Sequence, residues 1–305
     1  MIELRVWHQF VTLADELHFG RAAQRLHMTQ PPLTQAIQGL ERAIGVPLFA
    51  RTRRSVALTS AGAALLPQAR RVLAAAEELP RVAQAAAAGL VGQLRLAFVS
   101  NIAYGPLPDW LRSFRQQHAE VALQLREATL DVQLTAFDAD EIDAGFVLHA
   151  PGAAPPGFAA WRAQAEPLVM ALPEAHPAAA LATLRLADVA SEPLVIFPRQ
   201  IAPSLFDAVL AAYRAQGATP RIAQEAIQMQ TIVNLVSAGM GVAWVPESVT
   251  RLQRPGVVYR AVLDAGLRSE TSLIWREPPP PVVRRFVDHV KTQPPLPQAA
   301  VTQQR

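Results

Sequence analysis

The chain of 305 residues contains no cysteine and a single lysine, Lys291. The absence of cysteine excludes disulfide bonds, thiol catalysis and thiolate metal sites. The histidines are scattered, with no close pair at the spacing of helical metal ligands. No apolar run approaches the roughly eighteen residues of a membrane span, and residues 1–7 are typical of an amphipathic helix rather than a signal peptide. We therefore expect a cytoplasmic protein without cofactor, metal or membrane contact.

The sequence also lacks the short motifs of common enzymes. It has no phosphate-loop Gly-Lys pair and no nucleophile elbow, so catalysis is not expected. Its formal net charge is only +3, which by itself does not indicate a nucleic-acid partner. Hydrophobic residues make up 51% of a chain that is longer than one typical core, which indicates two or more domains.

Residues 20–44 contain two helical patterns placed back to back. Apolar residues recur at the three- and four-residue spacing of amphipathic helices, so each helix buries one side and exposes the other. In the first helix these residues are Ala22, Ala23 and Leu26, and in the second they are Leu33, Ile37, Leu40 and Ile44. Only His27 and Met28 separate the two patterns.

The second of these helices has a well-marked start and an uncharged polar side. Thr29 stands at the N-cap position, and Pro31 and Pro32 fall in the first turn, where a missing N–H costs nothing. Side chains of this kind can read base edges in a major groove; the solvent side carries Gln30, Thr34, Gln35 and Gln38. The arrangement predicts a helix-turn-helix, with an ordinary helical hairpin as the alternative.

Residues 46–59 predict two short strands around a basic tip that contains Arg51, Arg53 and Arg54. Guanidinium groups are planar and permanently charged, which suits them to phosphate oxygens. The position of this hairpin directly after a polar helix favours a DNA-contacting wing over a solvated loop.

A long alanine-rich helix is expected after the wing, capped by Thr59 or Ser60 and running to about residue 88. Its apolar residues alternate four and three apart, as in a coiled coil, so the helix is a candidate for dimerisation. These residues are Leu65, Ala69, Val72, Ala76, Leu79, Ala83 and Ala86. Pro67 and Pro80 interrupt the pattern, and we expect the seam to bend or to end early near Leu79. A buried helix of a monomer is the alternative.

From residue 94 onward, strand and helix patterns alternate, which predicts an α/β domain with a largely parallel sheet. Strands are expected at 94–99, 121–127, 143–148, 168–172, 194–197, 221–226, 242–245 and 271–275, and helices near 106–118, 130–138, 203–216, 229–239 and 280–292. The proline- and glutamine-rich residues 294–305 carry no motif and are expected to be disordered.

Ligands of open α/β sheets bind at the carboxyl ends of the strands, near helix amino termini that favour anions. Three strand-to-helix junctions therefore form the expected ligand site, at residues 100–106, 128–131 and 197–204. Its expected hydrogen-bonding residues are Ser100, Asn101 and Thr129, and its expected apolar residues are Ile102, Phe197, Pro198, Pro203 and Leu205. Local turn capping is the alternative role of each polar residue.

Residues 1–62 resemble the winged helix-turn-helix domain of LysR-type transcriptional regulators. The resemblance is carried by the runs at 10–14, 22–35, 40–51 and 58–62; Thr34 stands where the family usually has Ser. Residues 93–293 resemble the effector domain of the same family through the runs at 114–118, 121–127, 142–146, 194–199 and 235–246. The resemblance implies an α-helical winged helix-turn-helix domain and linker helix, followed by a two-lobed α/β effector domain like the periplasmic binding proteins.

The implied domains are a DNA-binding domain at 1–60, a linker and dimerisation helix at 61–88, a hinge at 89–92 and an effector domain at 93–293. The runs at Gln30–Leu33 and Phe197–Arg199 are most similar to the branch that controls catabolism of benzoate, catechol, chlorocatechol and muconate. In that branch an acidic metabolite is the usual inducer. By resemblance, Ser100 and Thr129 would bind its carboxylates.

The segment that contains Phe146 and Leu148 also belongs to the predicted effector site. Many relatives have an arginine or another polar residue where this chain has Leu148, so His149 or Arg199 is the candidate replacement for that anchor.

The sequence therefore predicts a regulator that binds a partly palindromic DNA operator as a dimer or homotetramer and responds to a small, anionic aromatic-pathway inducer. Contact with RNA polymerase is also expected. The alternatives are a small-molecule binding protein or enzyme that uses only the cleft, without DNA binding, and a structural coiled-coil adaptor.

Overall fold

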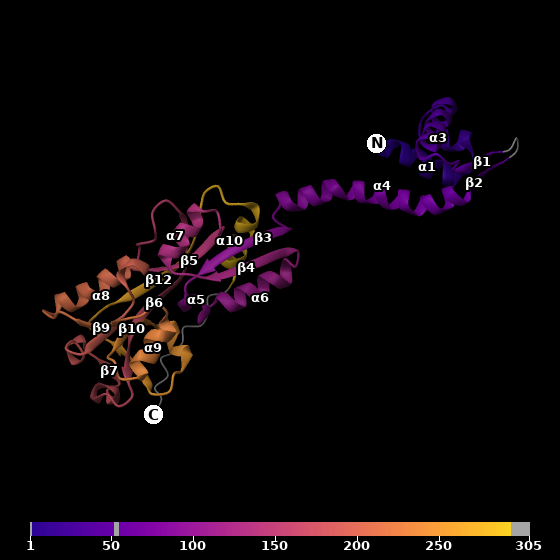
Figure 1. The fold of residues 1–305 in the computed structure, drawn as a ribbon. Coiled ribbons are helices and arrows are strands. Elements are labelled where there is room, and N and C mark those ends of the chain that lie inside the picture. Colours follow the sequence, from indigo (N-terminus) through magenta and orange to yellow (C-terminus); the bar gives the residue numbers. More distant parts are fainter. Residues whose placement is uncertain (1, 52–54, 294–305) are drawn as a thin grey trace. The chain divides into compact units, whose positions relative to one another are not determined.

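The computed structural model describes residues 2–51 and 55–293, and the chain divides into two compact units between residues 85 and 86. The first unit contains a three-helix cluster, a two-stranded hairpin and most of a long helix (Figure 1). Its elements are α1 (Leu4–Glu16), α2 (Phe19–Arg25), α3 (Gln30–Ile44), β1 (Phe49–Arg51), β2 (Val56–Leu58) and α4 (Ser60–Ala87). No helix in the described part of the chain is both long and apolar enough to cross a bilayer.

Helix α3 has the predicted buried face and the predicted start. Leu33, Ile37 and Leu40 are buried in one core with Phe10 and Leu13 of α1. Proline occupies the first turn, and Thr29 has the extended backbone of an N-cap, although its side chain makes no capping hydrogen bond. The helix ends at Gly45, whose φ of 85° lies in the left-handed region that favours glycine.

Helix α4 runs without interruption through Pro67 and Pro80 and ends at Ala87, close to the predicted end at about residue 88; the bend or early end of its apolar seam near Leu79 stays a prediction. Each proline removes one N–H donor, but the flanking alanine, leucine, arginine and glutamate residues are strong helix formers that continue the helix. Of the predicted seam, Ala69 packs into the first unit's core, while Val72 and Leu79 are exposed.

The second unit has a mixed eight-stranded sheet and a separate pair of strands. Its strands are β3 (Gly92–Phe98), β4 (Val121–Glu127), β5 (Ala144–His149), β6 (Ala159–Pro173), β7 (Thr183–Leu184), β8 (Pro193–Ile196), β9 (Arg221–Glu225), β10 (Ala243–Pro246), β11 (Val257–Val262) and β12 (Arg268–Trp275). Its α-helices are α5 (Ser100–Ala103), α6 (Leu107–Gln117), α7 (Leu130–Asp138), α8 (Pro203–Ala215), α9 (Met229–Ser237) and α10 (Pro281–Thr292). Short 3₁₀ helices lie at η1 (Pro177–Ala180), η2 (Leu186–Asp188), η3 (Arg199–Ile201) and η4 (Glu247–Leu252).

The large sheet has the order β4-β3-β5-β12-β6-β11-β7, and β10 also pairs with β6. Strands β3, β4 and β5 are parallel, but β12 is antiparallel to β5 and to β6, and β6 is antiparallel to β10 and β11. The expectation of a largely parallel sheet is therefore wrong, because the chain returns to its first strands through β12 after the other half has been built.

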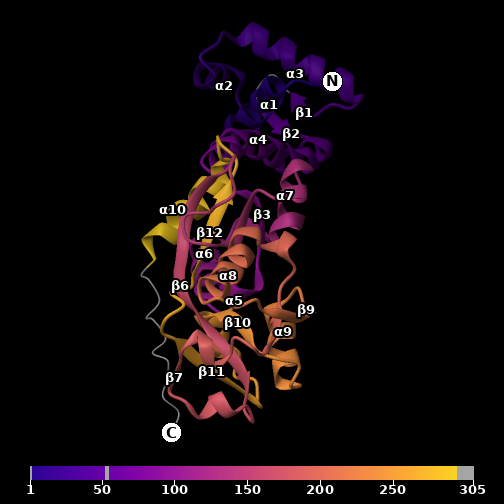
Figure 2. The same ribbon diagram turned by 90° about the vertical axis from the view of Figure 1, so that its left-hand side faces the viewer.

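Strand β6 is common to two lobes (Figure 2). Its first half pairs with β12 beside β3, β4 and β5, and its second half pairs with β10 and β11. Each lobe has its own core: one gathers around Phe114, Phe146 and Phe286, and the other around Leu205, Tyr213 and Trp244.

Candidate DNA-reading surface and ligand cavity

The outer side of α3 forms a surface that we call the reading face: Gln30, Pro31, Pro32, Thr34, Gln35 and Gln38. All of these residues except Thr34 are exposed. Thr34 is half-buried, and its hydroxyl donates to the Gln30 carbonyl at 3.1 Å, which leaves the oxygen able to accept another hydrogen bond. Thr29, at the N-cap, is exposed as well. The reading face thus offers amide and hydroxyl groups without a charged side chain.

The hairpin beside α3 is held by one carboxylate. Glu41 accepts hydrogen bonds from the backbone N–H groups of Leu48 and Phe49 at 2.9 and 3.1 Å. Its second oxygen lies 2.8 Å from Nη2 of Arg51, whose guanidinium is also 5.0 Å from the ring centre of Phe19. Arg51 is therefore tied to the body of the first unit. Arg53 and Arg54, the other predicted wing residues, lie outside the described residues.

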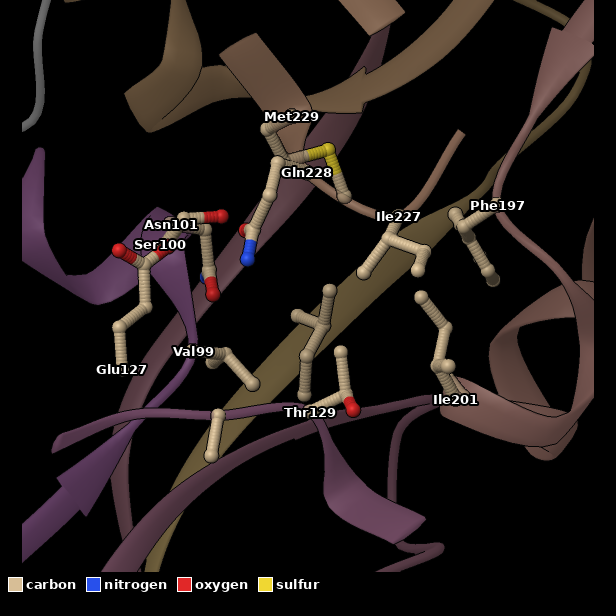
Figure 3. A pocket seen from close by; sticks show the side chains of 13 residues that line it. Val99, Ser100, Asn101, Glu127, Thr129, Phe197, Ile201, Ile227, Gln228 and Met229 are labelled. Carbon is tan, nitrogen blue, oxygen red and sulfur yellow. The ribbon is translucent and has the colours of Figure 1, made fainter. Parts of the chain in front are cut away.

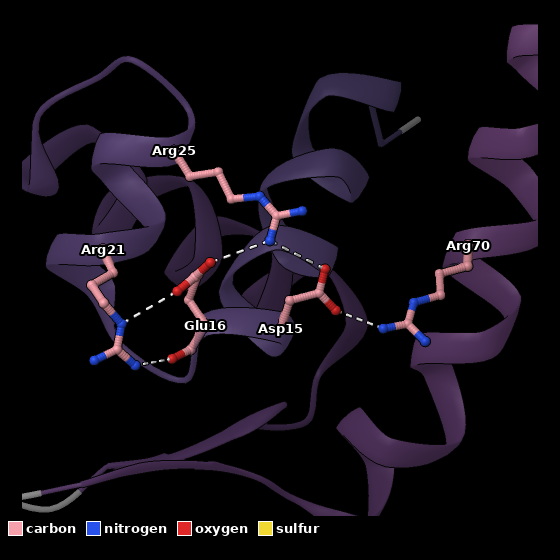
Figure 4. Close-up of polar contacts among 5 residues, drawn as sticks. All are labelled: Asp15, Glu16, Arg21, Arg25 and Arg70. Carbon is pink, nitrogen blue, oxygen red and sulfur yellow. Dashed lines mark hydrogen bonds and ion pairs between the residues drawn. The ribbon is translucent and has the colours of Figure 1, made fainter.

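Two acids of α1 organise three more arginines of the first unit (Figure 4). Glu16 pairs with Arg21 and Arg25 of α2, each at 3.2 Å. Asp15 lies 3.7 Å from Arg25 and 2.6 Å from Arg70 of α4. These contacts connect the end of α1 to both the first helix of the helix-turn-helix and the long helix.

The second unit contains a cavity at the carboxyl ends of four strands (Figure 3). Its walls come from the junctions that follow β3, β4, β8 and β9, with one residue of β5. They enclose an empty volume of about 400 Å³, including the mouth. The lining residues are Val99, Ser100, Asn101, Glu127, Ala128, Thr129, Leu148, Phe197, Ile201, Ala202, Ile227, Gln228 and Met229.

Five residues of the predicted effector site lie on this wall: Ser100, Asn101, Thr129, Leu148 and Phe197. The Ser100 hydroxyl makes no hydrogen bond to any described residue. The Thr129 hydroxyl donates to Asp131, so its lone pairs stay available. Thr129 stands at the amino terminus of α7, and Gln228 stands at that of α9. Two helix starts and two hydroxyls therefore face one small space.

Three residues of the predicted effector site belong instead to the hydrophobic cores. Ile102 is fully buried because α5 begins at Ser100 and turns this side chain into the core of the first lobe. Phe146 packs there against Trp110, with ring centres 5.9 Å apart. Leu205 is fully buried in the other lobe.

Pro198, Arg199 and Pro203 do not line the cavity either, because η3 places Ile201 and Ala202 on the wall in their place. Arg199 forms two hydrogen bonds with Asp207, at 2.8 and 2.7 Å. His149 is buried between the Ala150 carbonyl at 2.7 Å and the Ser272 hydroxyl at 2.9 Å. Neither Arg199 nor His149 therefore supplies the charged anchor that Leu148 cannot provide.

The fourth junction, which contributes Ile227, Gln228 and Met229, was not among the predicted ones. This junction could have been found from the sequence, since a strand was predicted at 221–226 and a helix at 229–239. Ala128, Ile201 and Ala202 lie within the predicted junctions but were not singled out, and Val99 and Glu127 directly precede two of those junctions.

Gln133 supports the wall from behind. Its Nε2 donates to the Ala128 carbonyl at 2.8 Å and to the Phe146 carbonyl at 3.0 Å, and its side chain is fully buried. Gly145 makes room for it, because a Cβ at that position would lie 2.1 Å from Gln133 Oε1.

The first unit is a helix-turn-helix with an exposed polar helix, and the second unit has two lobes and a cavity. This is the architecture of a ligand-responsive transcription regulator. The chain belongs to the LysR family, whose members are regulators of transcription rather than enzymes. Residues 4–63 match the bacterial regulatory helix-turn-helix protein, lysR family, and residues 87–295 match the LysR substrate binding domain. The protein is thus a LysR-type DNA-binding transcriptional regulator with an effector-binding domain.

Individual relatives agree over almost the whole chain. The regulator IlvR of Caulobacter vibrioides is 46% identical over 276 residues, which cover 90% of this chain and 92% of IlvR. AlsR of Bacillus subtilis is 35% identical, over 94% of each chain. The structure of full-length CbnR in complex with its target DNA matches with a TM-score of 0.78 at 32% identity, covering 95% of this chain and 98% of CbnR.

Proposed function

We propose that a small organic acid binds in the cavity of the second unit and changes how the reading faces of associated copies are placed on a partly palindromic operator. The acting species is a dimer or homotetramer in the cytoplasm, which communicates with RNA polymerase. Ligand binding can shift such an arrangement only if the ligand prefers one arrangement over another.

The observation that carries this proposal is the convergence of helix starts and hydroxyls on the cavity. The first N–H groups of α7 and α9 have no partner within their helices, and the helix dipole adds partial positive charge there. Thr129 and Gln228 stand at these two starts, and Ser100 lies beside them. A carboxylate would satisfy N–H groups and hydroxyls together.

The apolar part of the wall supports a ligand with a hydrocarbon body. Leu148, Phe197, Ile201, Ile227 and Met229 surround the polar groups. This lining suits an aromatic ring or a branched aliphatic chain. An aromatic-pathway inducer stays a prediction, which rests on the sequence motifs.

For the DNA side, support comes from the exposure of the reading face and from the relative CbnR, whose structure was solved with its target DNA. Amide side chains in a major groove discriminate among bases. We assign Thr29, Gln30, Pro31, Pro32, Thr34, Gln35 and Gln38 to this contact, with Arg51, Arg53 and Arg54 as phosphate ligands.

A gel-shift assay with the DNA beside the protein's own gene tests the proposal, with and without benzoate, muconate or salicylate. We expect sequence-dependent binding whose mobility or affinity changes with a bound acid. Ser100→Ala and Thr129→Ala should each weaken the acid's effect about tenfold, the equivalent of roughly one charge-assisted hydrogen bond. Thr135→Ala, in α7 but away from the cavity wall, is the control. An acid effect that survives both cavity substitutions would contradict the assignment.

A further inference from the structure

We propose that the ligand carries an ammonium group beside its carboxylate, so that the cavity takes an amino acid with an apolar side chain. The inference rests on the proposed function, because it assumes that the cavity binds a small acid. It adds a second polar group to that acid and thereby names the ligand class.

The charge on the cavity wall points to a cation. Glu127, at the end of β4, is the one charged side chain among the described residues that line the cavity. The Glu127 side chain is exposed and forms no ion pair with any described residue. His149 and Arg199, which could have countered it, are engaged with other partners. A simple anion would therefore meet an uncompensated carboxylate.

Asn101 supplies a second acceptor. The residue is 1% exposed, and its Nδ2 donates to the Thr271 hydroxyl at 2.9 Å. Its Oδ1 is buried and has no hydrogen-bond partner among the described residues. An unpaired buried acceptor is costly, so a ligand that donates a hydrogen bond there gains affinity that a plain acid cannot.

The two acceptors lie on the same side of the cavity. Figure 3 shows Ser100, Asn101 and Glu127 together, with Phe197, Ile201 and Ile227 on the other side. The starts of α7 and α9 complete the polar part with groups that favour a carboxylate. The cavity therefore offers donors for a carboxylate, acceptors for an ammonium group and an apolar wall. An amino acid with a hydrocarbon side chain would contact all three.

The test compares matched ligands on the full-length protein by isothermal titration calorimetry. L-leucine and L-phenylalanine are paired with 4-methylpentanoate and 3-phenylpropanoate, which differ from them only in lacking the amino group. We expect each amino acid to bind about tenfold or more tightly than its deaminated partner, the effect of roughly one charge-assisted hydrogen bond. Glu127→Gln should reduce that ratio several-fold. Glu120→Gln, just before the opposite end of the same strand, should leave the ratio unchanged.

The outcomes separate this inference from the proposed function. If the deaminated acids bind as tightly as the amino acids, the cavity still takes carboxylates, and only the ammonium is wrong. If the ratio survives Glu127→Gln, the carboxylate of Glu127 does not recognise the ligand and the inference fails. If neither series binds and benzoate, muconate and salicylate leave DNA binding unchanged, both the inference and the proposed function fail.

Discussion

Glu41 of α3 and Arg51 of β1 connect the helix to the hairpin beside it: Oε2 of Glu41 lies 2.8 Å from Nη2 of Arg51. The other carboxylate oxygen accepts from the backbone N–H groups of Leu48 and Phe49, two buried residues. One side chain of α3 therefore fixes both the start of the hairpin and the guanidinium that follows it.

Replacing Glu41 with alanine should destabilise this connection. Two buried N–H groups lose their acceptor, and we expect a loss of about 1–3 kcal/mol in the local free energy of opening. Hydrogen exchange followed by mass spectrometry should show faster exchange at residues 46–51. Glu77→Ala in α4, where the carboxylate has no partner among the described residues, serves as control, and equal exchange in both variants would contradict the role of Glu41.

The wing arginines should control salt dependence. If Arg53 and Arg54 neutralise DNA phosphates, alanine at both positions should flatten the slope of log affinity against log salt by up to about 2, since each phosphate contact contributes roughly 0.9. Arg51→Met should flatten it less, because Glu41 already shares that charge. An unchanged slope in the double variant would exclude the phosphate role.

The reading face should set base preference. Thr34→Ala and Gln35→Ala remove side chains that can bond to base edges, so binding-site selection from random DNA should return a more degenerate sequence. Gln24→Ala, an exposed amide of α2, is the control. Recovery of the wild-type site with both reading-face variants would refute the assignment.

Helix α4 should mediate self-association. Leu79 and Val82 are 66% and 52% exposed within one chain, so both apolar side chains are available to pack against a second copy. Glutamate at both positions should shift the protein toward monomers in size-exclusion chromatography with light scattering. Gln84→Glu adds charge to the same helix at an exposed polar position and should not. If the oligomer survives, the copies associate through another surface.

Glu166 should make stability fall as pH rises. It is buried, and burial raises the pKa of its carboxyl despite hydrogen bonds from Ser248 N and Oγ, which lower it. The folded protein thus holds a proton that the unfolded chain releases at lower pH. The resulting stabilisation is complete below the ordinary pKa and is lost as pH rises through the raised value.

Urea unfolding across the range from about pH 4 to pH 8 should show this loss relative to the Glu166→Gln variant, which cannot titrate there. The difference between the two proteins isolates Glu166 from the other groups. Parallel pH profiles would show that the carboxyl has no raised pKa.

Local patterns in the sequence were sufficient to predict most elements of both units. The apolar spacing and the proline start predicted α3, and the strand at 121–127 has the predicted bounds. Residues 159–167 were missed as the first half of β6, because this alanine-rich segment has weak strand propensity and is stabilised by β12. The direction of β12 could not be predicted, since it depends on pairing with residues far away in the chain.

The cavity was predicted only in part, because its lining also depends on contacts between residues far apart in the chain. The rule about carboxyl ends of strands identified the junctions that contain Ser100, Thr129 and Phe197. It could not show that α5 and η3 turn Ile102 and Arg199 away from the space, because a shift of one residue in a short helix changes which side chain faces the wall. The orphaned Oδ1 of Asn101 also depends on its contact with Thr271, 170 positions along the chain.

The shared strand β6 limits how the two lobes can move. It runs antiparallel to β12 along the lobe boundary, and their register shifts between Thr271 and Ser272. Hydrogen-bonded strands resist sliding along their length, whereas the local twist increases where a bulge breaks the ladder. Closure of the lobes around a bound ligand should therefore be a rotation of one lobe against the other about this irregular step.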